Sequence, residues 1–195
     1  MNIRHLLSGK SLPINFSSWN HTVQQTGGGK YFSVNISRGL TRLKGVFSTL
    51  YLAGSNVRLK EANNFYHPIS QQTVDSSTLS EEHSMWIQIG SQKFPEYPIQ
   101  SCSEAYYHLR KIIGDDMFSS NRWFRTSKYI VGIDTEKVPG AGFTGLNTKA
   151  GDLLTINFRD YNYNNVATTV PQNIFCALHY DAILNIRDNG VEVME

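Results

Sequence analysis

Hydrophobic and polar residues alternate along several short stretches of this chain, which is the pattern of β-strands with one buried face. Strands are predicted at residues 31–36, 40–52, 84–89, 126–134 and 152–158. The last part of the chain, residues 174–195, contains two strand-forming runs that meet at Asp188-Asn189-Gly190. Asn-Gly favours a tight hairpin because a type I′ turn needs positive φ at both central residues. The pattern therefore predicts a late hairpin that completes a sheet.

One helix is predicted among these strands, over residues 101–113. Ser101 and Glu104 fit a capping box, in which the hydroxyl and the carboxylate satisfy unpaired N–H groups of the first turn. Four apolar residues then follow at helical spacing on one face, namely Ala105, Leu109, Ile112 and Ile113. Gly114 is suited to end the helix. We therefore expect Leu109 to face the core.

The remaining segments are polar or contain prolines. Residues 1–30 are polar, end in a run of glycines and are predicted to be an N-terminal arm or linker. Phe94-Pro-Glu-Tyr-Pro98 is predicted to be a rigid aromatic loop, because proline cannot donate to a β-ladder. Gly45 lies inside a predicted strand and suggests a β-bulge. Residues 31–195 are predicted to form a single domain, an all-β antiparallel sandwich of the jelly-roll type with one inserted helix.

Composition narrows the function classes. The 195 residues carry a net charge of +2 and only 17% charged side chains, so no basic excess indicates nucleic-acid binding. No apolar run approaches the roughly 18 residues of a membrane span, and the N-terminus lacks the apolar region of a signal peptide. Cys102 and Cys176 are too few for a disulfide scaffold and are interpreted as two free thiols.

Motifs of enzyme chemistry find no support in their surroundings. Gly140 to Gly145 match G-x-G-x-x-G, but no helix is predicted after them, so we interpret them as a glycine-rich turn rather than a dinucleotide site. His179 and Asp181 share a strand face, yet no serine sits in a strained elbow, and we interpret them as a surface or interface pair. The sequence therefore predicts no catalytic residue, no metal site and no cofactor.

Several segments resemble a known family. They are Phe94-Pro-Glu-Tyr-Pro98, Ser103-Glu-Ala-Tyr-Tyr-His-Leu-Arg110, Gly132-Ile-Asp-Thr-Glu-Lys137, Gly142-Phe-Thr-Gly145, Ala150-Gly-Asp-Leu-Leu154 and Leu178-His-Tyr-Asp-Ala-Ile183. Together they look like jelly-roll capsid proteins of eukaryotic viruses and virus-like elements. The resemblance covers roughly residues 40 to 195. In the double-jelly-roll capsid lineage one chain carries two such barrels, whereas this chain has room for one.

The resemblance implies a structural protein that self-assembles into a virion shell inside the host cell. Its partners would be copies of itself, as a trimer or pentamer that then builds the shell, together with other capsid proteins. Phe94, Pro95, Tyr97 and Pro98 are the predicted subunit contacts, since aromatic residues in rigid segments are good interface anchors.

Two other function classes stay open at this point. One is a carbohydrate-binding sandwich, in which aromatic residues such as Trp86, Tyr97 or Trp123 would stack on sugars. The other is a cupin-like metalloenzyme with a metal held by His67, His83 and His179. Symmetric oligomers or shells of the purified protein would favour the shell protein. Binding to glycans would favour the carbohydrate-binding sandwich, and a stoichiometric transition metal would favour the metalloenzyme.

Overall fold

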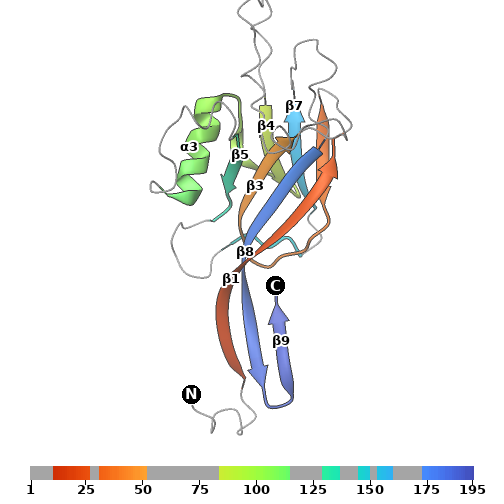
Figure 1. Cartoon of the computed structure of the whole chain (residues 1–195), viewed down its shortest axis with the longest axis vertical. Coiled ribbons are helices and arrows are strands. Elements are labelled where there is room, and N and C mark those ends of the chain that lie inside the picture. The colour runs from red at the N-terminus through yellow and green to blue at the C-terminus, as the bar shows by residue number, and fades with distance from the viewer. Residues whose placement is uncertain are drawn as a thin grey trace, which may run out of the picture.

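The computed structural model describes residues 11–26, 31–51, 84–114, 129–136, 145–149, 153–159 and 173–195. These residues form two antiparallel sheets and one helix, α3 (Cys102–Ile113) (Figure 1). The first sheet contains β1 (Leu12–Gln25), β3 (Leu43–Tyr51), β6 (Val131–Asp134), β8 (Asn173–Arg187) and β9 (Gly190–Met194). The second contains β2 (Phe32–Ile36), β4 (Ser84–Ile89), β5 (Gln92–Ile99) and β7 (Leu154–Arg159).

The strand order is that of a jelly roll. In the first sheet the order is β1-β8-β3-β6, with β9 added to β8, and in the second it is β2-β7-β4-β5. Every pair is antiparallel, and apart from the β4–β5 and β8–β9 hairpins each consecutive strand crosses to the opposite sheet. The predicted fold class, an all-β jelly-roll sandwich with one inserted helix, is confirmed.

The core lies between the two sheets and follows the period-2 alternation of the strands. On β8 the hydrophobic core side chains are every second residue, from Ile174 through Leu178 to Ala182, and the polar Asp181 on the outer side is buried as well. They face the buried residues of β4 and β7, of which Ile87 and Ile156 are cross-strand partners. The opposite side of β8 belongs to the outer face of the sheet. Side chains of the first sheet therefore lie either on its inner face, towards the second sheet, or on its outer face.

Helix α3 covers the outer face of the first sheet over β3 and β6. It begins with the predicted capping box, in which Ser101 Oγ accepts from the Glu104 N–H at 3.1 Å. Leu109 is fully buried. The helix approaches closely because Gly132 of β6 has no side chain there: a Cβ would lie 2.9 Å from Ile112 and 3.0 Å from Leu109. Both the helix and its buried face are therefore as predicted.

The predicted C-terminal hairpin and the bulge at Gly45 are also present. β8 and β9 pair across the turn at Asp188 and Asn189, and the register of β3 against β8 shifts between Leu43 and Gly45. The last glycine of the G-x-G-x-x-G match, Gly145, lies against the backbone of Arg42, where a Cβ would come within 2.6 Å. Residues 140–144 lie outside the described residues, so the turn interpretation is tested only at its end.

Two segments differ from the prediction. Residues 12–25, assigned to an arm or linker, form β1, which pairs with β8 along its whole length. Residues 94–98, predicted to be a loop, lie within β5. The loop prediction was wrong because β5 is an edge strand of the second sheet, where a proline need not donate to a neighbour. The boundary between an arm and a domain at residue 30 stays a prediction.

Leu109→Asp tests how α3 packs against the first sheet. Because the change buries an unpaired charge and removes a buried apolar side chain, we expect the free energy of unfolding to fall by more than about 3 kcal/mol. Tyr107→Asp, on the exposed side of the same helix, is the matched control and should change stability by less than about 1 kcal/mol. Urea unfolding of both variants is the measurement. Equal losses would contradict the assignment of the two faces.

Candidate interaction surfaces

The residues predicted as subunit contacts lie side by side on β5, but they are not equally accessible. Phe94 is half-buried and packs against the core, and Pro95 and Pro98 are also half-buried. Tyr97, in contrast, has 82% of its surface exposed. Of the four predicted residues, Tyr97 therefore offers the largest surface to a partner, while Phe94 also serves the fold.

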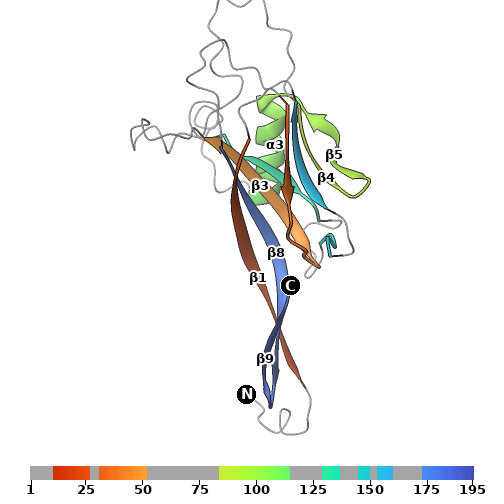
Figure 2. The same cartoon turned by 90° about the vertical axis from the view of Figure 1, so that its right-hand side faces the viewer.

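A second surface is a ribbon that projects from the sandwich along its long axis (Figures 1 and 2). We use the name projecting ribbon for residues 12–17 of β1, 181–187 of β8, and β9. Its pairs include Ile14 with Leu184 and Leu184 with Val193. Beyond Ala182 the inner face of β8 continues into this ribbon, but the second sheet does not extend over it (Figure 2).

The inner face of the projecting ribbon is apolar and open. Cross-strand partners point to the same side of a sheet, so β1, β8 and β9 all contribute to this face. The contributing side chains are Leu12, Ile14, Phe16, Leu184, Ile186, Val191 and Val193, which continue the face beyond the buried Ala182. Val191 is 64% and Val193 52% exposed. An exposed apolar face of this extent is typical of an interaction site.

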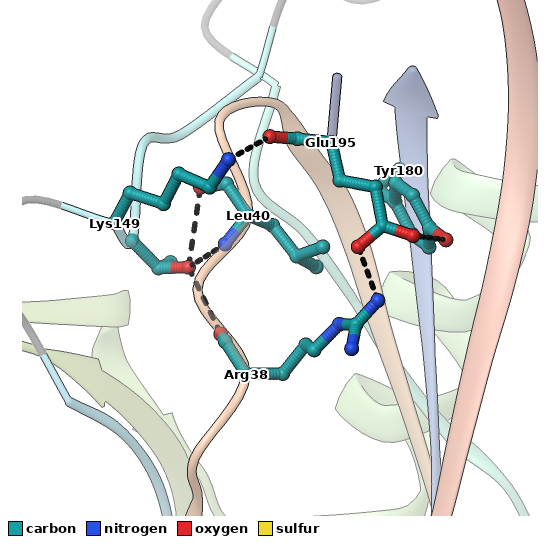
Figure 3. Close-up of polar contacts among 6 residues, drawn as sticks. Arg38, Leu40, Lys149, Tyr180 and Glu195 are labelled. Carbon is teal, nitrogen blue, oxygen red and sulfur yellow. Dashed lines mark hydrogen bonds and ion pairs between the residues drawn. The ribbon is translucent and has the colours of Figure 1, made fainter. Parts of the chain in front are cut away.

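Glu195, which directly follows β9, is hydrogen-bonded and ion-paired to residues of the sandwich (Figure 3). The Glu195 carboxylate accepts a hydrogen bond from the Tyr180 hydroxyl at 3.2 Å and forms an ion pair with Arg38. The Glu195 backbone oxygen accepts from Lys149 Nζ at 2.7 Å. These contacts join residues far apart in the sequence, and no local pattern could have predicted them. They hold the projecting ribbon in a defined direction relative to the sandwich.

A third surface is an apolar hollow of about 480 Å³ between α3 and the outer face of the first sheet. Trp19 of β1 forms one wall and is 56% exposed. Its ring stacks on His179 at a centroid distance of 4.5 Å and lies 5.3 Å from the Phe47 ring. The other apolar lining residues are Ile112, Ile113, Ile130, Phe175 and Ala177. Trp19 was not among the predicted site residues, because it lies in the segment that was predicted to be an arm or linker.

The predicted His179 and Asp181 pair lies beside this hollow, and each residue has other partners. Asp181 accepts from Ser17 Oγ at 2.7 Å and lies 3.5 Å from Lys44 Nζ, which also contacts Glu136 at 3.0 Å. The hydrogen bond to Glu136, followed by the charge of Asp181, raises the pKa of Lys44 above its ordinary value despite partial burial. Burial, and then the charge of Lys44, lowers the pKa of His179. The arrangement is a structural ion network.

The metal and sugar hypotheses find no positive support in the described part of the chain. Among the described residues, no group of three or more His, Cys, Asp or Glu side chains is placed to hold a metal. His67, His83 and Trp123 lie outside these residues. Trp86 is only 7% exposed, with Lys93 and Arg159 over its ring at 5.4 and 5.1 Å, so little of the ring is left for a sugar.

Two further sequence interpretations concern the cysteines and the membrane. The Cys176 thiol is free and buried, and burial raises its pKa to about 12. Nothing is described of the Cys102 side chain. No helix in the described ranges has the length and apolar character that crossing a membrane would need.

Comparison with known proteins gives a likeness of fold. No protein-family model and no curated protein matches the chain. Among solved structures, the chain is similar to VP54 of PBCV-1, in a crystal structure fitted into a cryo-EM reconstruction of the virophage Sputnik. The TM-score is 0.54 at 9% identity, over 95% of this chain and 51% of the VP54 chain. The chain thus spans about half the length of VP54 and shares its fold.

The lowered pKa values of two histidines predict that the free energy of unfolding depends on pH. Burial lowers the pKa of both His179 and His108 from the ordinary value of 6.5. As the pH falls below that value, the unfolded chain takes up protons before the folded chain does. We therefore expect the contribution of these two histidines to the free energy of unfolding to be constant above about pH 7. It should decrease as the pH falls from about 6.5 to the lower pKa values of the histidines in the folded protein.

Urea unfolding between about pH 7.5 and about pH 5.5 measures this effect. His179→Gln removes one of the two histidines whose pKa is lowered in the described part of the chain, so the decrease in stability across this range should be smaller than in the wild-type protein. An identical pH dependence in the two proteins would contradict the assignment to His179.

Proposed function

We propose that this protein is a capsid-type structural subunit that self-assembles into a virion shell. The observation that carries the proposal is the open apolar inner face of the projecting ribbon, where a core face continues without its opposing sheet. Leaving such a face in water is unfavourable by about 25 cal/mol for each Å² of apolar surface, so contact with another subunit is favoured. The likeness to VP54 over 95% of the chain supports a shell protein in particular.

The proposed partners are copies of the same chain, arranged as a trimer or pentamer that builds the shell, together with other capsid proteins. Identical subunits favour closed symmetry, and obligate contacts bury about 2,000 Å² or more. The β5 residues Phe94, Pro95, Tyr97 and Pro98 are proposed as one contact of this assembly, with the exposed Tyr97 ring as its anchor. The proposed location is the virion, after assembly inside the host cell. We propose no catalytic activity for the protein.

Tyr97→Ser tests this contact with little effect on the fold. Because Tyr97 is exposed, its loss should leave the melting temperature within about 2 °C of the wild-type value. Assembly should weaken by at least about tenfold if the ring is an anchor of the interface. Phe94→Ser should weaken assembly too, but it should also lower the melting temperature, because Phe94 packs against the core.

Sedimentation velocity and electron microscopy of the purified proteins are the measurements. Tyr107→Ser, which removes another exposed tyrosine from α3, is the control and should assemble like the wild-type protein. A wild-type protein that stays monomeric at tens of micromolar, and that no other capsid chain recruits, would overturn the proposed function. Unchanged assembly of the Tyr97→Ser variant would contradict the proposed contact through β5.

A further inference from the structure

The two sheets present edge strands that differ in how well they are protected against pairing with another strand. An unpaired edge exposes a row of N–H and C=O groups, and proteins usually protect it by short length, charge or proline. β2 and β6, at two of the edges, are five and four residues long. β5 carries Lys93, Glu96 and two prolines. These three edges are protected in the usual ways.

β1 lacks this protection. It is 14 residues long and contains no Lys, Arg, Asp or Glu, and its single proline, Pro13, is near one end. Within the described residues β8 is its strand partner, and no backbone hydrogen bond joins its outer edge to another element. One side-chain hydrogen bond, donated by Gln24 Nε2 to the Asn35 backbone oxygen, lies at the far end of the strand. Because antiparallel neighbours use alternate residues, about half of the N–H and C=O groups of β1 point away from β8.

The side chains beside this edge are also exposed and apolar. Ile14 and Phe16 lie on the inner side of β1, and Trp19 and Val23 on the outer side, and all four are exposed. A strand added at the edge would cover apolar groups on both faces while satisfying the free backbone groups. This is the arrangement expected of an edge that another strand extends.

We propose that the edge of β1 pairs antiparallel with β1 of a second copy of this chain, around a two-fold axis. The strand is suited to itself because it carries no formal charge, so identical strands meet without the repulsion that like charges would cause. Antiparallel pairing of one segment with itself is isologous and therefore closes at two copies. An acidic or basic partner strand would find no charge on β1 to complement.

The pairing is centred on the ribbon half of β1, residues 12–17. There the strand projects clear of the sandwich (Figure 2). In the proposed dimer the two sandwiches would therefore lie at opposite ends of the joined ribbons without colliding. The inner faces of the two ribbons then form one wider apolar surface. This inference rests on the proposed self-assembly and names one of its contacts.

The first experiment adds charge at the edge. Ile14→Lys with Asn15→Lys places like charges of two copies close together, and we expect at least about tenfold weaker self-association, recovering partly in high salt. The matched control, Ser103→Lys with Tyr107→Lys, puts the same charge on the exposed side of α3, away from both proposed contacts, and should associate like the wild-type protein. Sedimentation velocity measures association, and melting temperatures show that both variants fold.

The second experiment locates the two-fold axis. Single cysteines at residues 14, 15, 16 and 23 are introduced in a Cys102→Ser background and oxidised under mild conditions. Only cysteines near the axis come within the Cβ separation of about 4 Å that a disulfide needs. We expect disulfide-linked dimers from one or two of Ile14→Cys, Asn15→Cys and Phe16→Cys, and none from Val23→Cys.

The outcomes separate this contact from self-assembly in general. Wild-type association that survives charge on β1, with no selective disulfide, would overturn β1 pairing and leave the shell proposal standing. Monomeric wild-type protein at tens of micromolar would overturn both. Loss of association with charge on β1 but not with charge on α3, together with a disulfide confined to the ribbon half, would support the pairing.

Discussion

The pairing of β8 on both of its sides is the interaction on which the rest of the structure depends. β8 is 15 residues long and pairs with β1 throughout, while its other side pairs first with β3 and then with β9. Its backbone is thus paired on both sides along most of its length, in the sandwich and in the projecting ribbon alike. What changes along β8 is only burial, because the second sheet covers its first part and leaves the last part open.

The parts of this fold that could be predicted are those that local patterns specify. Alternation located β2, β4 and β7, Asn189-Gly190 located the hairpin, and the capping box located α3 to within one residue. Each of these signals acts over a few residues and agrees with the burial that the fold imposes. Gly45 marked a real shift in register, and its missing side chain also leaves room for α3, since a Cβ there would lie 2.2 Å from the Ile112 side chain.

β1 could not be predicted in this way because its alternation changes phase. In its first half the apolar side chains are the even-numbered Leu12, Ile14 and Phe16, whereas in its second half they are the odd-numbered Trp19 and Val23. The strand exists because β8 offers a complete set of backbone partners, which is a long-range property. β5 was missed for the related reason that its prolines exclude a central strand but not an edge strand, and the sequence does not show which strand is at an edge.

The same long-range properties decide which candidate surfaces suit which kind of contact. β5 is protected against strand pairing by charge and proline, so it can contribute only through side chains such as Tyr97, and side-chain contacts between different patches suit the rotational symmetry of a ring. β1 offers its backbone, and antiparallel self-pairing requires a two-fold axis. The proposed shell would use both kinds of contact, one to form rings and one to join them. Because β1 and β5 belong to different sheets, one subunit could make both contacts at once, and the Glu195 contacts that orient the projecting ribbon would then set the angle between neighbouring rings.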